Sequence, residues 1–213
     1  MEPIGSFLSG QRLKLAELQD YVIDIIYDNS GKDTFLYGGT AIWRCFGGMR
    51  FSEGIYIYLD RNEFDKFTLS LDEYGLRLIW QDPELPTRIR IAGDAAELLL
   101  ESKPGIAENE IKAYSRVDGS VKTISVLSAT ELMSRKIEAY QGRGFIRDIY
   151  DLYVLTNWLD KSDYMVKSKI SNFLHGIQTP VDENILSSLL YAGPVNLNFH
   201  SMVSYISRWV NEI

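Results

Sequence analysis

The segment Phe35–Asp60 constrains the fold of this chain more than any other part of the sequence. An apolar run predicts a strand at residues 34–37, and a Gly-Gly-Thr motif at Gly38–Thr40 follows directly. A short helical stretch comes next, and the residues after Ser52 have the composition of a second strand. Two glycines after a strand let backbone amides approach an anion, and the start of a helix adds a favourable dipole. The segment therefore predicts an anion site at a strand-to-helix turn; an ordinary tight turn is the alternative interpretation.

The second predicted strand carries Gly54 and Tyr56 at alternate positions. Alternate residues of a strand face the same side, so two acids at this spacing would place two carboxylates side by side. Such a pair can hold the magnesium ions that accompany a triphosphate. Neither residue has a carboxylate. Glu53 should point to the opposite face, and Asp60 lies too far along the strand, so neither acid can stand in for a carboxylate at position 54 or 56.

The rest of the sequence predicts an α+β fold, with a mixed β-sheet and flanking helices followed by a helical bundle. Short β-rich runs between Gly, Pro and Asp turns predict strands at residues 76–80, 88–91, 97–100, 110–114 and 121–126. Apolar residues at helical spacing predict helices at residues 13–27, 63–74, 128–142, 146–159, 165–176, 182–192 and 198–211. In the helix at 128–142, Ser128 is the expected N-cap, in a capping box with Glu131, and Gly142 is expected to end the helix. In the helix at 146–159, Trp158 is expected to be buried. We place a boundary near residue 127, which gives an α/β domain at 1–127 and a helical domain at 128–213.

The composition narrows the possible functions. A net charge of −7 argues against a protein that coats nucleic acid by bulk electrostatics, since such domains are usually basic. A local basic patch is still possible and would consist of Arg135, Lys136, Arg143 and Arg147. The alternative is that these residues form an ordinary solvated helix face. No apolar run reaches the ~20 residues of a membrane span, and the start of the chain lacks the pattern of a secretory signal. The single Cys45 is expected to be a buried thiol. We expect a cytoplasmic protein without membrane contact.

Two separated segments resemble the AbiEii-type nucleotidyltransferase toxins. The first match is Gly-Gly-Thr-Ala, then Arg-x-Ser, then the strand on which that family carries Asp-Ile-Asp. The second is the predicted helix with Lys136, followed by an Arg-Asp-x-x-Asp-Leu segment at residues 147–152. The resemblance implies a nucleotidyltransferase fold, a nucleoside triphosphate as substrate, Mg²⁺ as cofactor, and tRNA or another RNA as acceptor. It also implies an antitoxin-like protein as a partner.

The resemblance assigns roles to particular residues. It implies catalytic positions at Ser52, Lys136 and Asp148, with Asp151 anchoring its helix. The nucleotide-binding positions it implies are Gly38, Gly39, Thr40, Arg50 and Lys136. A plain surface ion pair between Lys136 and Asp148 is the alternative. The fold also has a further acid on a neighbouring strand, expected as a metal ligand at Glu101; Glu97 on the same face competes, and a carboxylate in a solvated turn is a further alternative.

Three functions are compatible with this sequence. At the two acid positions of the family this chain has Gly54 and Tyr56, so the first is a nucleotidyltransferase with impaired transfer. The second is a non-catalytic protein that binds a nucleotide or RNA. The third is a partner-binding module of a toxin-antitoxin-like system. In the first two cases we expect one cleft to gather Gly38, Thr40, Ser52, Lys136 and Asp148.

Overall fold

A computed structural model describes residues 2–193 and 197–212. The chain forms two compact units. The first consists of the chain up to Cys45 together with Phe51–Leu127, and the second of Phe46–Arg50 together with the chain from Ser128 on. Among the described residues, no helix combines the length and the apolar character that crossing a bilayer requires.

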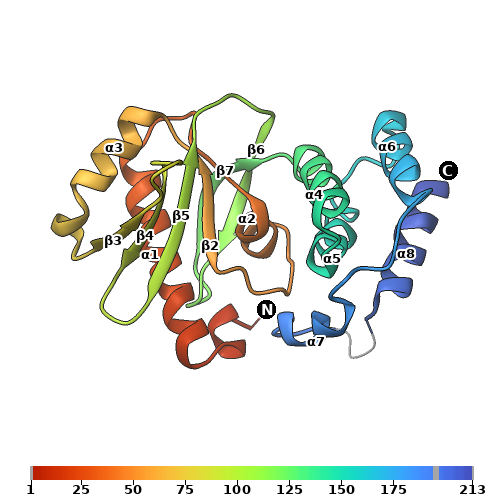
Figure 1. The fold of residues 1–213 in the computed structure, drawn as a ribbon, viewed down its shortest axis with the longest axis horizontal. Coiled ribbons are helices and arrows are strands. Elements are labelled where there is room, and N and C mark those ends of the chain that lie inside the picture. Colours follow the sequence, from red (N-terminus) through yellow and green to blue (C-terminus); the bar gives the residue numbers. More distant parts are fainter. Residues whose placement is uncertain (1, 194–196, 213) are drawn as a thin grey trace. The chain divides into compact units, whose positions relative to one another are not determined.

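The first unit is built on a mixed sheet (Figure 1). Within the described residues this sheet has seven strands in the order β3-β4-β5-β2-β1-β7-β6. Strand β1 pairs antiparallel with β2 and parallel with β7, and β2 pairs parallel with β5. The strands are β1 Phe35–Tyr37, β2 Gly54–Tyr58, β3 Arg77–Gln81, β4 Arg88–Ala92, β5 Glu97–Lys103, β6 Asn109–Ser115 and β7 Val121–Leu127. The predicted α+β class is confirmed, and each predicted strand forms with shifts of a few residues at its ends.

The helices of the first unit are α1 Gly10–Asn29, α2 Gly38–Cys45 and α3 Arg61–Leu69, with 3₁₀ turns at η1 Ile4–Phe7 and η2 Leu71–Tyr74. Helix α1 contacts β5, and α2 contacts β1, β2, β6 and β7. Arg44 of α2 donates to the carbonyl oxygen of Ala16 in α1 (3.1 Å), so both helices share a face. The apolar residues Leu36, Ile55 and Ile57 point into this side and are fully buried. Their strand neighbours, including Tyr37 and Tyr56, point to the opposite face.

Two predictions for the first unit need correction. The Gly-Gly-Thr motif is not a separate turn, because β1 ends at Tyr37 and α2 begins at Gly38. The predicted helix at residues 63–74 is interrupted, since α3 ends at Leu69 and a 3₁₀ turn follows Ser70. Ser70 caps the end of α3 through its backbone amide, which donates to Lys66.

The second unit is helical. Its elements are α4 Ala129–Arg143, α5 Ile146–Leu155, α6 Tyr164–Leu174, η3 Glu183–Ile185, α7 Leu186–Leu189 and α8 Phe199–Asn211. The predicted N-cap is confirmed, since the Ser128 hydroxyl accepts a hydrogen bond from the Glu131 amide (3.3 Å). Helix α4 continues through Gly142 and ends at Gly144, which has a φ of 66° and can adopt the left-handed C-cap conformation. Trp158 lies beyond the end of α5 and is 46% exposed, so its predicted burial is wrong.

Candidate functional site

The Gly-Gly-Thr motif forms the junction between β1 and α2. Gly38 has a φ of 78°, in the left-handed region that favours glycine, and Gly39 is the second residue of the helix. The first turn of a helix leaves backbone amides without intrahelical acceptors, so this junction offers donors to an anion. Thr40 is fully buried, and its hydroxyl donates to the carbonyl oxygen of Gly54 (2.5 Å). The hydroxyl proton is therefore used within the unit, and the anion-binding capacity of the motif rests on its backbone.

The side chain of Tyr56 packs against two glycines, Gly38 and Gly54. A Cβ atom on Gly38 would lie 3.4 Å from Cδ2 of Tyr56, and one on Gly54 would lie 3.3 Å from its Cε2. The ring therefore packs against both glycines. It also lies beside the cross-strand neighbour Tyr37, with 5.8 Å between the ring centroids. An aromatic side chain thus occupies the space next to the strand positions that hold acids in the resembled family.

The other polar residues around β2 have structural contacts. Ser52 is buried, and its carbonyl oxygen accepts a hydrogen bond from Nε2 of Gln19 (2.7 Å). Asp60 caps α3, because its carboxylate accepts from the amide of Asn62 (2.8 Å). Glu53 is exposed. Neither Asp60 nor Glu53 replaces the missing pair of acids on β2.

Glu101 lies directly beside Tyr56. The two residues are partners in the parallel pairing of β2 with β5, and Glu101 is also opposite Arg88 of β4. Its Oε2 atom lies 3.5 Å from Nε of Arg88, and its side chain is 23% exposed. Glu101 is therefore a strand residue, and its assignment to a solvated turn is wrong. Glu97 is at the start of β5, where it pairs with Arg90 (3.7 Å).

The side chains around β2 and β5 do not fit a magnesium site. Mg²⁺ is bound by oxygen ligands in near-ideal octahedral geometry, usually through one or two carboxylates and substrate phosphates. Gly54 has no side-chain oxygen, the Tyr56 ring fills the neighbouring space, and Glu101 is paired with Arg88. Over residues 2–193 and 197–212, no group of three or more His, Cys, Asp and Glu side chains is placed to hold a metal ion. The carboxylate beside Tyr56 on this part of the sheet, that of Glu101, is therefore already bound by an arginine.

A second group of predicted residues lies in the helical unit, where the segment 46–50 is fixed against α5 and the turn that follows it. The Met49 amide donates to Oη of Tyr150 (2.8 Å). Nε1 of Trp158 donates to the carbonyl oxygen of Phe46 (2.8 Å). These contacts fix the end of the segment, and with it the arginine at position 50.

Asp151 is shared by two cations. Arg50 donates from Nε to Oδ1 (2.9 Å) and from Nη2 to Oδ2 (2.8 Å), which is a bidentate contact. Nζ of Lys136 lies 2.6 Å from Oδ2. The carboxylate of Asp151 is 1% exposed, so these contacts replace its water. Asp151 therefore anchors α5 to both α4 and the segment that ends at Arg50.

Asp148 is held by two cations as well. Arg143 donates from Nε to Oδ2 (2.8 Å) and from Nη2 to Oδ1 (2.8 Å), and Nζ of Lys136 lies 3.3 Å from Oδ1. The side chain of Asp148 is fully buried and that of Lys136 is 10% exposed. The alternative of a plain surface ion pair between Lys136 and Asp148 is therefore wrong. Lys136 bridges two buried acids.

The ion pair between Asp151 and Arg50 favours the charged form of both residues. Burial raises the pKa of Asp151, but Arg50 and Lys136 lower it more, so the pKa is below its usual value. Burial lowers the pKa of Arg50, but Asp151 raises it more. Three cations face two acids in the cluster of Arg50, Lys136, Arg143, Asp148 and Asp151, which leaves one excess positive charge.

The structure thus gathers the predicted residues in two places. Arg50, Lys136 and Asp148 share one ion-pair network in the second unit. The remaining positions lie in the first unit around the α2 start, at Gly38, Gly39, Thr40, Ser52, Gly54, Tyr56 and Glu101. That the two groups face one cleft stays a prediction.

The sequence did not reveal two ion-pair partners, Arg143 and Arg88, but it did predict the burial of Cys45. Arg143 was predicted only as part of a basic patch. The turn at Gly144 brings the last turn of α4 next to the first turn of α5, where Arg143 pairs with Asp148. Arg88 was missed because its pairing with Glu101 depends on strand register. Cys45 is buried, as predicted, and burial raises the pKa of its thiol.

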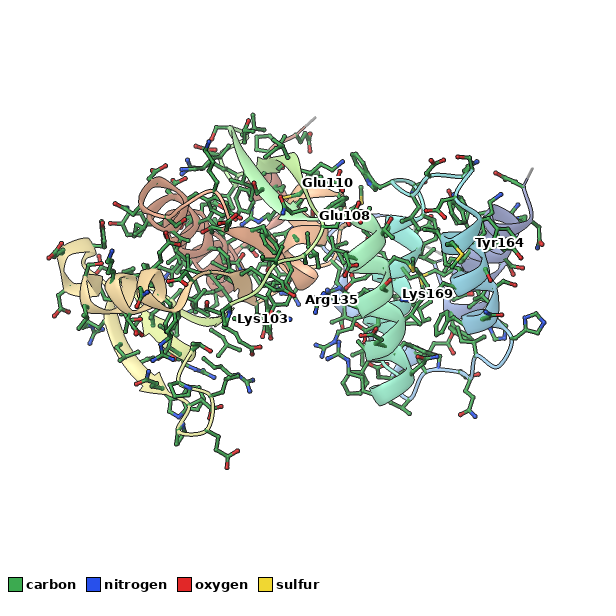
Figure 2. The ribbon with its side chains drawn as sticks, turned by 90° about the horizontal axis from the view of Figure 1, so that it is seen from above. Lys103, Glu108, Glu110, Arg135, Tyr164 and Lys169 are labelled. Atoms are coloured by element: carbon green, nitrogen blue, oxygen red, sulfur yellow. The ribbon has the colours of Figure 1, made fainter. Side chains whose placement is uncertain are left out.

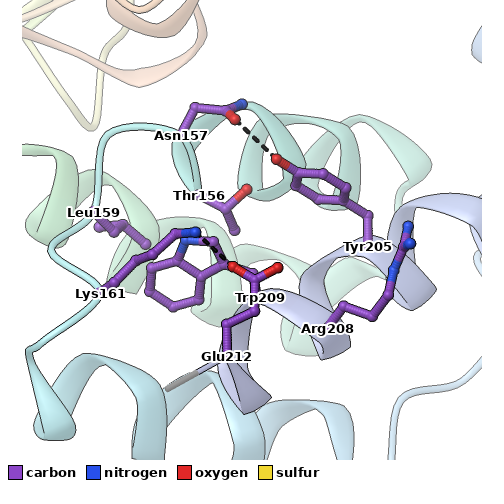
Figure 3. A pocket seen from close by; sticks show the side chains of 8 residues that line it. All are labelled: Thr156, Asn157, Leu159, Lys161, Tyr205, Arg208, Trp209 and Glu212. Atoms are coloured by element: carbon purple, nitrogen blue, oxygen red, sulfur yellow. Dashed lines mark hydrogen bonds and ion pairs between the residues drawn. The ribbon is translucent and has the colours of Figure 1, made fainter.

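A polar pocket of about 280 Å³ lies elsewhere in the second unit, between α8 and the turn after α5 (Figure 3). Lys161 and Glu212 form an ion pair in it (2.5 Å), and Tyr205 donates to Oδ1 of Asn157 (2.9 Å). Nε1 of Trp209, which also lines the pocket, is buried without an acceptor among the described residues. None of the predicted site residues lines this pocket.

Comparisons with known proteins define the fold. The sequence matches no protein-family model and no curated protein. The nucleotidyltransferase toxin MenT4 from Mycobacterium tuberculosis is 15% identical and has a TM-score of 0.62, over 95% of this chain and 85% of that chain. The protein JHP933 from Helicobacter pylori is 17% identical, also with a TM-score of 0.62, over 96% of this chain and 92% of that chain. ANT(2'')-Ia in complex with adenylyl-2''-tobramycin is 12% identical, with a TM-score of 0.51, over 75% of this chain and 97% of that chain. The chain therefore has the nucleotidyltransferase fold.

Proposed function

We propose that this chain is a nucleotidyltransferase-fold protein that binds a nucleoside triphosphate but transfers nucleotides poorly. The single observation that carries this proposal is the Tyr56 ring, which stands at one of the two acid positions of the resembled family and packs against the other, Gly54. The AbiEii-type toxins remain the family that the sequence motifs resemble. Of the proteins with a similar fold, MenT4 is a nucleotidyltransferase toxin, and ANT(2'')-Ia was solved in complex with adenylyl-2''-tobramycin.

The binding mode follows from donors that the chain retains. Backbone amides at the start of α2 can donate hydrogen bonds to a phosphate group, and the helix dipole favours an anion there. Lys136 supplies the second element of the proposed site, since its cluster has an excess positive charge. Asp148 orients Lys136, and Ser52 is the remaining hydroxyl beside β2. This mode needs no divalent cation.

The chemical step is where the chain is deficient. Nucleotidyl transfer requires an acceptor hydroxyl to attack a phosphorus atom while pyrophosphate leaves. Electrostatic stabilisation of the developing charge is usually the largest catalytic contribution, and losing one donor typically costs about 10²–10³-fold in rate. Gly54 and Tyr56 provide no carboxylate for this purpose, so we expect slow transfer.

The acceptor and the partner follow from the family resemblance. We propose tRNA or another RNA as the acceptor, an antitoxin-like protein as a partner, and a cytoplasmic location. A non-catalytic protein that binds a nucleotide or RNA is the second candidate, and the packing of Tyr56 against both glycines is equally compatible with it. A pure partner-binding module is the third candidate.

The experiment compares the unmodified chain with G54D, Y56D and the double variant. Total tRNA and each labelled triphosphate are incubated with magnesium, and RNA labelling is measured. A Cβ atom at position 54 would lie 3.3 Å from both the Tyr56 ring and the Leu99 carbonyl oxygen, so G54D alone should be the least stable variant. We expect little labelling by the unmodified chain and more by the double variant. Robust magnesium-dependent labelling by the unmodified chain would contradict the proposed impairment.

A further inference from the structure

Two arginines lie over one aromatic ring at the turn between α4 and α5. Cζ of Arg143 is 5.4 Å from the ring centroid of Phe145, and Cζ of Arg147 is 5.2 Å from it. Guanidinium groups within about 6 Å of an aromatic centroid are attracted by its quadrupole. Phe145 therefore contacts both guanidinium groups and limits the motion of Arg147.

The turn that carries this ring is itself fixed. Gly144 adopts a φ of 66°, and its carbonyl oxygen accepts from the amide of Val181 (3.0 Å). The amide of Ile146 donates to Oδ1 of Asp182 (2.6 Å), which satisfies a backbone donor at the start of α5. Contacts on both sides of Phe145 thus fix the backbone that carries the ring.

The two arginines differ in their ion pairs. Arg143 is bound by Asp148 through two hydrogen bonds, so much of its charge is used within the protein. Arg147 forms no ion pair with any residue in the described ranges, and its Nε is buried without an acceptor. The outer nitrogens of Arg147 are therefore the part of this cluster best placed to bind an external group.

We propose that Arg147, supported by Phe145, binds single-stranded RNA. A planar guanidinium held by an aromatic ring can stack against a base and donate to a phosphate, which is how proteins commonly bind unpaired RNA. An acidic peptide would need only the positive charge. That this RNA is the acceptor rests on the proposed function, whereas the binding itself does not.

The test is fluorescence anisotropy with a labelled single-stranded RNA of mixed sequence, measured without nucleotide over a series of salt concentrations. R147Q should weaken binding about 5- to 100-fold, the range reported for loss of a stacking contact. Its plot of log K against log salt should be shallower by about 0.7, the value for one phosphate contact on a single strand. R147K should keep the salt slope but lose affinity, because lysine lacks the planar group. F145L should behave like R147K.

Two variants in the same unit serve as controls. R208Q removes one arginine charge from α8, and Y164A removes a 77% exposed aromatic ring from α6. Figure 2 shows Tyr164 on α6, away from the side of the helical unit where Arg135 projects from α4. Both controls should bind RNA as the unmodified chain does. Thermal unfolding of every variant establishes that it is folded.

Several results would overturn the proposal. The first is the absence of RNA binding by the unmodified chain, and the second is equal binding by R147Q and R208Q. The third is full binding by R147K, which would show that the site needs only a positive charge and would favour an acidic peptide as its ligand. Triphosphate titration of R147Q separates this inference from the proposed function. Loss of RNA binding with unchanged triphosphate binding supports the RNA site, whereas RNA binding by a chain that binds no triphosphate would leave this site intact and reject the proposed function.

Discussion

Asp151 is a buried acid that two cations share in the helical unit. Its buried carboxylate compensates Arg50 and Lys136 together, and those cations come from different parts of the chain. Removing one partner of a buried ion pair leaves a charge without compensation, and this costs more than the intact pair contributes.

We therefore predict that D151N lowers the free energy of unfolding by about 3–5 kcal/mol. The matched control is D65N, which breaks the ion pair between Arg61 and Asp65 (3.0 Å), whose side chains are about half exposed. An exposed pair of this kind should change stability by no more than about 1 kcal/mol. Urea unfolding measures both variants, and equal effects of the two would contradict the buried network.

The same residue gives a pH dependence with a definite sign. The pKa of Asp151 is lowered in the folded chain, so its contribution to stability is complete above the ordinary aspartate pKa of about 4. The contribution is lost as the pH falls through that value and then through the folded pKa. Below about pH 4, the unmodified chain should lose stability more steeply than D151N. Parallel profiles for the two proteins would show that Asp151 is not charged in the folded state.

At the scale of single elements, the junction between β1 and α2 needs a glycine. Gly38 has a φ of 78°, and a left-handed conformation costs other residues about 1–2 kcal/mol. We predict that G38A loses about this amount in thermal or urea unfolding. G142A is the control with the opposite sign: Gly142 lies inside α4 with open space around its Cβ position, so alanine should stabilise by about 0.5–1 kcal/mol. Equal effects at both positions would contradict the assigned conformations.

Much of this fold could be predicted from the sequence because its local signals agree. The runs that became β4, β5 and β7 are bounded by turn residues, and Ser128 starts α4 as its capping pattern predicts. Gly142 was expected to end the helix, but α4 ends at Gly144, which has the left-handed conformation. The hydrogen bond between Val181 and Gly144 that fixes this turn is not visible in the sequence.

The candidate site was less predictable because it depends on distant contacts. The absence of acids at Gly54 and Tyr56 is visible in the sequence, whereas the packing of the Tyr56 ring on Gly38 depends on strand register. Likewise, the sequence suggests an acid at Glu101, but its pairing with Arg88 depends on the order of β4 and β5 in the sheet. Trp158 was placed on a buried helix face because the end of α5 was not recognised.

At the scale of the whole molecule, the chain enters the helical unit twice. Residues 46–50 belong to that unit although they lie between elements of the sheet unit. A fragment of residues 128–213 would therefore lack Arg50, and the contact of Trp158 with Phe46 would be lost as well. We predict that this fragment lacks the cooperative thermal unfolding of the intact chain, measured by circular dichroism. A cooperative transition at the temperature of the intact chain would show that the segment is dispensable.

The central claim is that the chain binds a nucleoside triphosphate without a metal site. Its most direct test is calorimetric titration with each of the four triphosphates, with excess magnesium and with EDTA. We predict that at least one triphosphate binds, and that its Kd differs less than about threefold (about 0.7 kcal/mol) between the two conditions. The double variant G54D/Y56D should gain a clear magnesium dependence, since it restores two carboxylates on one strand face. No binding of any triphosphate, or an affinity of the unmodified chain that magnesium raises more than about tenfold (about 1.4 kcal/mol), would contradict the account.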